Sequence, residues 1–164
     1  MIYLHKSRQR DNRAAATQLL RRGLAEEYGI TGDLVFTYGP NGKPYLTEYP
    51  RVFFNISHCR TGAACVISDR EAGIDIQDVR AFSQRTARRV CTEAELARLA
   101  ASPAPERLFC RLWAVKEAYV KWHGGSILDE IVDTEAVISG ALLHEGADYF
   151  VCCFGCDNGV VVIA

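Results

Sequence analysis

The sequence lacks a net charge of either sign and lacks any long hydrophobic run. Its 19 Lys and Arg residues nearly balance its 20 Asp and Glu residues, so the formal net charge at pH 7 is −1. A nearly neutral protein exerts little overall attraction on nucleic acid or on an anionic membrane surface. A run of about 18 apolar residues would indicate a membrane-spanning helix, and the sequence contains none. We therefore expect neither nucleic acid nor a membrane among the partners.

The sequence also lacks the features of a secreted protein. The first residues, MIYLHKSRQR, contain no long apolar core of the kind found in signal peptides, which predicts a cytoplasmic protein. Seven cysteines are present, and an odd number argues against a complete disulfide framework. Cys153 and Cys156 form a Cys-x-x-Cys pair, but a structural zinc site needs two further ligands, and no second pair is evident. We interpret this segment as an apolar C-terminal strand.

The first half of the sequence predicts one helix followed by short strands. Apolar residues recur every three or four positions between residues 11 and 30, which is typical of an amphipathic helix, and Gly29 is placed to end it. A turn sequence, PNGKP, follows between two short β-like runs. The segments RVFFNISHC, TGAACVIS and GIDIQDV then predict three strands connected by turns.

The second half repeats this order of helices followed by strands. The sequence TEAE has the spacing of a capping box, which predicts the start of a short helix. A longer helix is expected to begin near residues 103–106 and to end at Gly124, and the tail predicts two or three strands. We infer an α+β protein with two similar lobes, residues 1–72 and 73–164, each a small antiparallel sheet with helices packed on it. No flexible linker separates the lobes, so we expect them to pack against each other.

The strand expected at residues 73–80 carries polar side chains on one face. Because alternate residues of a strand point to opposite faces, Asp75 and Gln77 point together, away from Ile74 and Ile76. A surface strand would explain this pattern, and so would a cation site. Acid and amide oxygens are suitable ligands for a hard cation.

Two further groups of polar residues have both a structural and a chemical explanation. Trp113, Glu117 and Lys121 are spaced by four and share one face of the long helix. Glu117 and Lys121 would form a surface ion pair worth about 0.3–0.5 kcal/mol, or they would serve a site. Ser57 and His58 follow a buried-looking strand, where small polar groups cap turns or bind phosphate oxygens. The residues alone leave these alternatives open.

Four motifs in a fixed order, NGKPYL, FFNISH, GIDIQ and LWAVKEAYVK, carry a family resemblance. Trp113, Lys116, Glu117 and Lys121 match the motif W-x-x-K-E-x-x-x-K, and Asp75 matches the aspartate of G-I-D. Together the motifs resemble the 4′-phosphopantetheinyl transferase superfamily. The likeness is closer to the enzymes that activate surfactin-type peptide synthetases than to the short holo-acyl-carrier-protein synthases. It runs from about the first helix to the long helix.

The resemblance implies a fold and an activity. Such enzymes are pseudo-dimers of two α+β lobes with coenzyme A bound between them, and an internal pseudo-dimer predicts a monomer. They transfer the 4′-phosphopantetheine arm of coenzyme A to a serine hydroxyl of an apo acyl or peptidyl carrier protein and release adenosine 3′,5′-bisphosphate. The carrier serves fatty acid, polyketide or nonribosomal peptide synthesis. Magnesium, with manganese as an alternative ion, bridges the pyrophosphate to acidic side chains.

The resemblance also implies roles for individual residues. Asp75 and Glu117 would hold the metal ion, while Gln77, at a position that is normally glutamate, would bind it weakly or through water. Glu117 would be the base for the incoming serine, directly or through a metal-bound water. Lys121 would neutralise a pyrophosphate oxygen, which makes these two the catalytic residues. The expected coenzyme A contacts are Lys43, Ser57, His58, Asp75, Lys116, Lys121 and, at the start of the first helix, Arg13.

Two departures from the family pattern keep other functions open. Gln77 removes one carboxylate from the expected metal site. The region before the first helix is short, so Lys6, Arg8 or Arg10 would replace missing contacts to the 3′-phosphate. A catalytically weak or silent module that binds coenzyme A or a carrier protein would fit both departures. A generic magnesium phosphohydrolase would explain the acidic residues, but not the face formed by W-x-x-K-E-x-x-x-K.

Overall fold

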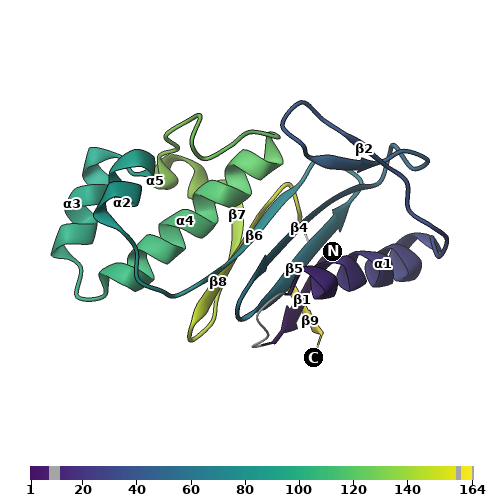
Figure 1. Cartoon of the computed structure of the whole chain (residues 1–164), viewed down its shortest axis with the longest axis horizontal. Helices are drawn as coiled ribbons and strands as arrows, with labels where there is room; N and C mark the ends of the chain where they lie inside the picture. Colours follow the sequence, from purple (N-terminus) through teal and green to yellow (C-terminus); the bar gives the residue numbers. More distant parts are fainter. Residues whose placement is uncertain (8–11, 158–159, 164) are drawn as a thin grey trace.

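The chain begins with a strand, and groups of helices and strands then follow one another. The computed structural model describes residues 1–7, 12–157 and 160–163, and Figure 1 shows their arrangement. Within these residues no helix has the length and apolar character needed to cross a membrane. The elements are β1 (Ile2–Lys6), α1 (Arg13–Tyr28), β2 (Phe36–Tyr38), β3 (Pro44–Leu46), β4 (Phe53–Cys59), β5 (Gly62–Ser68), β6 (Gly73–Asp78), α2 (Gln84–Val90), α3 (Glu93–Ala101), α4 (Pro105–Trp122), α5 (Thr134–Val137), a 3₁₀ turn (Ile138–Gly140), β7 (Ala141–Glu145), β8 (Tyr149–Phe154) and β9 (Val160–Ile163).

One sheet unites strands from both ends of the chain. Its order is β4-β5-β1-β9. β1 pairs antiparallel with β5 and parallel with β9, so the strand Val160–Ile163 completes the sheet that β1 begins. Helix α1 packs on this sheet (Figure 1).

Helix α1 forms as its periodicity predicts. Its buried residues are Ala16, Leu19, Leu20, Gly23 and Leu24. The helix ends at Gly29, whose φ of 67° is the left-handed conformation that glycine adopts readily. Gly23 permits close packing on the sheet, because a Cβ atom there would lie 2.5 Å from Cδ1 of Ile67 and 2.6 Å from the ring of Tyr3.

The second large sheet has the order β6-β8-β7 with antiparallel neighbours, and α4 packs against β6 and β8. A Cβ atom at Gly73 would lie 2.3 Å from both the backbone oxygen of Ala118 and the backbone nitrogen of Trp122. The predicted α+β class, with small, mostly antiparallel sheets and packed helices, is confirmed, and the parallel pair β1–β9 is the exception. That the halves form a pseudo-dimer divided after residue 72 stays a prediction.

Two short helices were not predicted by the sequence patterns. Helix α2 follows Ser83, whose side chain accepts a hydrogen bond from the backbone nitrogen of Thr86. Helix α5 follows Asp133, whose carboxylate accepts one from the backbone nitrogen of Glu135. The segment Thr134–Val137 is therefore helical, and the strands expected in the tail follow it as β7, β8 and β9. Both helices are too short to show a clear apolar period, and their N-cap residues are the main local signal.

Strands β4 and β6 lie side by side although they are edge strands of separate sheets. Side chains connect them. The backbone nitrogen of Ile74 donates to Oδ1 of Asn55 at 3.0 Å, and the Ser57 hydroxyl donates to Oδ1 of Asp75 at 2.7 Å. The partners advance together along both strands, so the strands run parallel. We call this contact the β4–β6 seam.

A buried ion pair anchors α4 to the helices around it. Lys116 and Glu95 are 0 % and 1 % exposed, and Nζ of Lys116 donates to Oε2 of Glu95 at 2.7 Å. The Lys116 ammonium also donates to the backbone oxygen of Val132. Glu95 completes the predicted capping box with Thr92 and accepts hydrogen bonds from the backbone and hydroxyl of Thr134. The pair thus links α3, α4 and the start of α5.

Replacing Glu95 by glutamine is expected to destabilise the fold by about 3–5 kcal/mol, because the buried Lys116 ammonium loses its counter-charge. Urea unfolding measures the loss. The double variant Glu95→Gln/Lys116→Met removes both charges and should recover much of the stability. If Glu95→Gln were as stable as the wild type, the buried pair would not have this importance.

The stabilising effect of Glu95 should also depend on pH. Burial alone would raise the pKa of Glu95, but hydrogen bonds from Lys116, Thr134 and Thr92 outweigh burial and hold this pKa below its ordinary value. A lowered pKa stabilises the folded state above the unfolded value of about 4.3, and this stabilisation is lost as pH falls through the lowered pKa. The stability difference between wild type and Glu95→Gln should therefore shrink below about pH 4. A difference that stays constant from neutral to acidic pH would contradict this assignment.

Candidate functional site

A cluster of polar side chains occupies the β4–β6 seam where it meets α4. Oδ1 of Asp75 accepts hydrogen bonds from the Ser57 hydroxyl at 2.7 Å and from Nζ of Lys121 at 2.6 Å. Nζ of Lys121 also lies 3.4 Å from the Ser57 hydroxyl oxygen and 3.7 Å from Oε2 of Glu117. The structure therefore brings together four of the residues that the sequence singled out, from β4, β6 and α4.

The charges in this cluster affect one another. Burial and the nearby charge of Asp75 raise the pKa of Glu117 and outweigh the opposing effect of Lys121. Burial alone would lower the pKa of Lys121, but the carboxylates of Asp75 and Glu117 raise it. Lys121 is therefore a protonated cation held between two carboxyl groups. A carboxylate with a raised pKa is a stronger base than an ordinary glutamate, which suits proton abstraction.

One atom of the cluster is left for a ligand. Oδ2 of Asp75 is buried and has no hydrogen-bond partner among the described residues, a costly state for a polar atom. A divalent cation would satisfy this oxygen. Mg²⁺ commonly takes one or two carboxylates together with phosphate oxygens and water, and Asp75 and Glu117 supply two. In the described part of the chain there is no group of three or more His, Cys, Asp or Glu residues placed to hold a metal.

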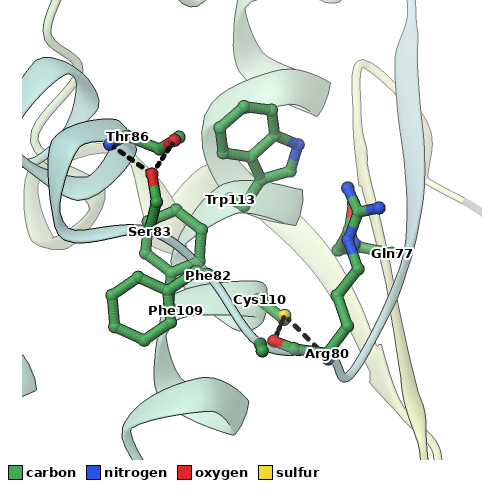
Figure 2. A pocket seen from close by; sticks show the side chains of 9 residues that line it. Gln77, Arg80, Phe82, Ser83, Thr86, Phe109, Cys110 and Trp113 are labelled. Carbon is green, nitrogen blue, oxygen red and sulfur yellow. Dashed lines mark hydrogen bonds between the residues drawn. The ribbon is translucent and has the colours of Figure 1, made fainter.

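Gln77 lies further along the same strand, at the edge of a pocket. Its Nε2 donates to the backbone oxygen of Asp78 at 3.1 Å, so the amide oxygen is the group suited to a cation or to a water bound to one. Figure 2 shows Gln77 and Trp113 in the lining of this pocket, where the rings of Phe82 and Phe109 stack with centroids 4.3 Å apart. The lining therefore combines the aromatic rings of Phe82, Phe109 and Trp113 with polar side chains, among them Gln77.

Lys43 lies beside the cluster and connects distant segments. Its Nζ donates to Oε2 of Glu71 at 2.6 Å and to the backbone oxygens of Ala72 at 3.1 Å and Trp122 at 3.2 Å. The lysine thus fastens the β2–β3 hairpin to the end of α4. A small hollow opens beside it, lined by Asn41, Gly42, Lys43, Asn55, Lys121, Gly124 and Gly125.

His58 and Arg13 lie near the β4–β5 turn. The exposed His58 side chain lines a hollow together with Arg60, Gln77 and Arg80. Arg13 is the first residue of α1, and the preceding Asn12 donates to the backbone oxygen of Cys59 at 2.7 Å, which ties the helix start to this turn. Arg8 and Arg10 fall outside the described residues.

Lys116 is an expected coenzyme A contact that the structure buries in the core, away from the cluster. Successive residues of a helix are turned by about 100°, so Lys116 points into the core while its neighbour Glu117 faces the seam. Its ammonium is committed to Glu95 and Val132. We therefore leave Lys116 out of the proposed ligand contacts. The partner Glu95 could have been recognised only as an N-terminal capping residue, because its contact with Lys116 spans 21 positions.

Comparison with known proteins connects this geometry to a family. A sequence model described as the 4'-phosphopantetheinyl transferase superfamily matches residues 71–151. The 4'-phosphopantetheinyl transferase psf-1 of Bacillus pumilus is 31% identical over 112 residues, which cover 66% of this chain and 48% of that protein. The transferase Sfp of Bacillus subtilis is 30% identical over 109 residues, covering 65% and 49%. HetI of a Nostoc species is 34% identical over 128 residues, covering 71% and 54%.

The chain spans about half the length of these relatives. The segment matched by the superfamily extends from the start of β6 into β8. It contains Asp75, Glu117 and Lys121, the charged residues that meet in the seam. On the matched segment, the similar relatives and the four ordered motifs, the chain belongs to the 4′-phosphopantetheinyl transferase superfamily.

Proposed function

We propose that the protein transfers the 4′-phosphopantetheine arm of coenzyme A to a serine hydroxyl of an apo acyl or peptidyl carrier protein. The observation that carries the proposal is the seam cluster, in which one buried oxygen of Asp75 has no partner in the described parts of the chain while Lys121 bridges Asp75 and Glu117. Two carboxyl groups and an ammonium suit a pyrophosphate with its counter-ion. The proposal also takes support from the relatives named as transferases of this arm.

In the proposed reaction the carrier's serine oxygen forms a bond to the β-phosphorus of coenzyme A. The bond from that phosphorus to the oxygen bridging the two phosphates breaks, and adenosine 3′,5′-bisphosphate leaves. Glu117 takes the serine proton, which its raised pKa favours. Lys121 neutralises a pyrophosphate oxygen, and Ser57 orients Asp75 through their hydrogen bond. A bound Mg²⁺ would supply charge neutralisation of the pyrophosphate.

The finer parts of the proposal concern the ion and the setting. We take Mg²⁺ as the ion, with Mn²⁺ as a substitute, held by Asp75 and Glu117 with Gln77 weakly or through water. We take the protein to act as a monomer in the cytoplasm. The alternative, a silent module that binds coenzyme A or a carrier, is motivated by Gln77, which leaves the ion with two carboxylates.

Incubation with coenzyme A, Mg²⁺ and a purified apo carrier protein distinguishes the two functions. Transfer adds the mass of the phosphopantetheine arm to the carrier, and intact-protein mass spectrometry detects it. A carrier of unchanged mass, with coenzyme A still bound in a calorimetric titration, would favour the silent module.

Glu117→Gln is expected to reduce the transfer rate by at least about 100-fold, because the amide cannot accept the serine proton. The melting temperature should stay close to that of the wild type. Glu130→Gln, which neutralises an exposed carboxylate outside the seam, is the matched control and should keep its rate. A Glu117→Gln protein that retained most of the wild-type rate would show that Glu117 is not the base.

Gln77→Glu is expected to lower the Mg²⁺ concentration that gives half the maximal rate by about tenfold. One added charge near the ion contributes a few kcal/mol of attraction at short range, which desolvation and repulsion from Asp75 reduce to about 1.4 kcal/mol. The maximal rate need not rise, because Asp75 and Glu117 hold the ion once it saturates the site. Superimposable Mg²⁺ titrations of the two proteins would place residue 77 outside the ion's coordination.

His58→Ala and Lys121→Ala are expected to affect two substrates differently. His58 is proposed to contact the 3′-phosphate, so its loss should raise KM for coenzyme A more than for dephospho-coenzyme A, which lacks that group. Lys121 is proposed to contact the pyrophosphate, so its loss should impair both substrates alike. Steady-state kinetics with both substrates measures this. The same pattern in both variants would contradict the assigned contacts.

A further inference from the structure

Asp78, the last residue of β6, is bonded to the turn that joins β4 to β5. Its Oδ1 accepts hydrogen bonds from the backbone nitrogen of Thr61 at 3.0 Å and from the Thr61 hydroxyl at 2.6 Å. Its Oδ2 accepts one from the backbone nitrogen of Arg60 at 3.2 Å. The side chain is buried, and all of these partners lie in the turn that joins two strands of the other sheet. Asp78 therefore connects the two sheets through three hydrogen bonds.

This connection closes one end of the β4–β6 seam. At the other end, Asn55 accepts the hydrogen bond from Ile74. β4 and β6 belong to separate sheets, so these side-chain hydrogen bonds, and not backbone pairing, fix the register of one strand relative to the other. A single attachment at Asn55 would leave the far end of β4 free to pivot. The bond from Ser57 to Asp75 lies between the two attachments.

The turn held by Asp78 begins at Arg60, two residues after His58. The hollow lined by His58 has three basic side chains, those of His58, Arg60 and Arg80, and Asp78 forms part of its wall. The Asp78 carboxylate is directed at the turn, where it accepts backbone hydrogen bonds. It holds Arg60, which lines the hollow, and Thr61, which lies next to it in the turn, and its Oδ2 also lies 3.8 Å from Nε of Arg60.

We infer that Asp78 is a positioning residue for the proposed transferase: by clamping the β4–β5 turn to β6, it places His58 against the 3′-phosphate of coenzyme A without touching the ligand. The inference rests on the proposed function, because that function assigns the 3′-phosphate to His58. It differs from a purely structural role in one respect. Loss of the clamp affects the ligand that carries a 3′-phosphate more than the ligand that lacks it.

The test compares binding of coenzyme A and dephospho-coenzyme A by calorimetry, and transfer where it can be measured. Asp78→Asn keeps the size of the side chain but turns one acceptor into a donor that faces an N–H group. We expect it to weaken coenzyme A binding about tenfold, equivalent to about 1.4 kcal/mol, with less than about a twofold change for dephospho-coenzyme A. The rate at saturating coenzyme A should stay within about twofold, because Asp75, Glu117 and Lys121 make other contacts.

Graded variants on the other side of the clamp provide matched controls. Thr61→Val removes the 2.6 Å hydroxyl bond but leaves the backbone bond, so it should show a smaller effect of the same selectivity. Thr61→Ser keeps a hydroxyl at this position and should behave as the wild type. Asp133→Asn, at an exposed carboxylate that caps α5, should leave both affinities unchanged.

A double-variant cycle with His58→Ala decides whether Asp78 acts through His58. If it does, Asp78→Asn should cause little further loss of coenzyme A affinity in the His58→Ala background, because the two changes remove one shared contact. Additive losses of coenzyme A affinity in the double variant would overturn the inference. So would an Asp78→Asn protein that loses affinity equally for both ligands or loses none. Equal binding of the two ligands by the wild type would also overturn it. A wild type that prefers coenzyme A but transfers nothing would refute the proposed function, while the binding cycle would still decide the role of Asp78.

Discussion

The side-chain attachment of β4 to β6 is the constraint on which the site depends. In a continuous sheet, backbone hydrogen bonds would occupy the space between neighbouring strands. Here the strands are edges of separate sheets, connected at one end by Asn55 and at the other by Asp78. Between these attachments Ser57 and Asp75 face each other, so the seam presents side chains rather than peptide groups to a ligand. Helix α4 then adds Glu117 and Lys121 from the side.

Two adjacent residues of α4 have different roles, one in holding the fold together and the other in the proposed site. Lys116 and Glu117 are neighbours in the chain, yet Lys116 is paired with Glu95 in the core while Glu117 lies in the seam with Lys121. The buried pair holds the rotation of α4, because a turn of the helix about its axis would pull the ammonium from its partners. The orientation of Glu117 toward Asp75 therefore depends on a contact made on another side of the helix.

Local sequence signals predicted the helices and strands better than the contacts between them. Gly29 and the capping box at Glu95 marked helix ends correctly, and alternation placed Asp75 on the polar face of its strand. The short helices α2 and α5 were not predicted, because their main local signal is a single N-cap residue. The burial of Lys116 against Glu95 depends on how separate elements pack, and so does the contact of Asp78 with Thr61. Residue spacing and periodicity do not predict such packing.

The parallel pairing of β1 with β9 has a consequence for folding during synthesis. A sheet whose neighbours in space are Ile2–Lys6 and Val160–Ile163 has contacts of very high sequence separation, and such contacts form slowly because a long loop must close first. While the ribosome is still translating the second half, β1 can pair with β5, but its other edge stays exposed. An uncovered edge strand readily pairs with other chains. The nascent protein should therefore pass through a stage prone to association, which ends when residue 163 has emerged and β9 covers that edge.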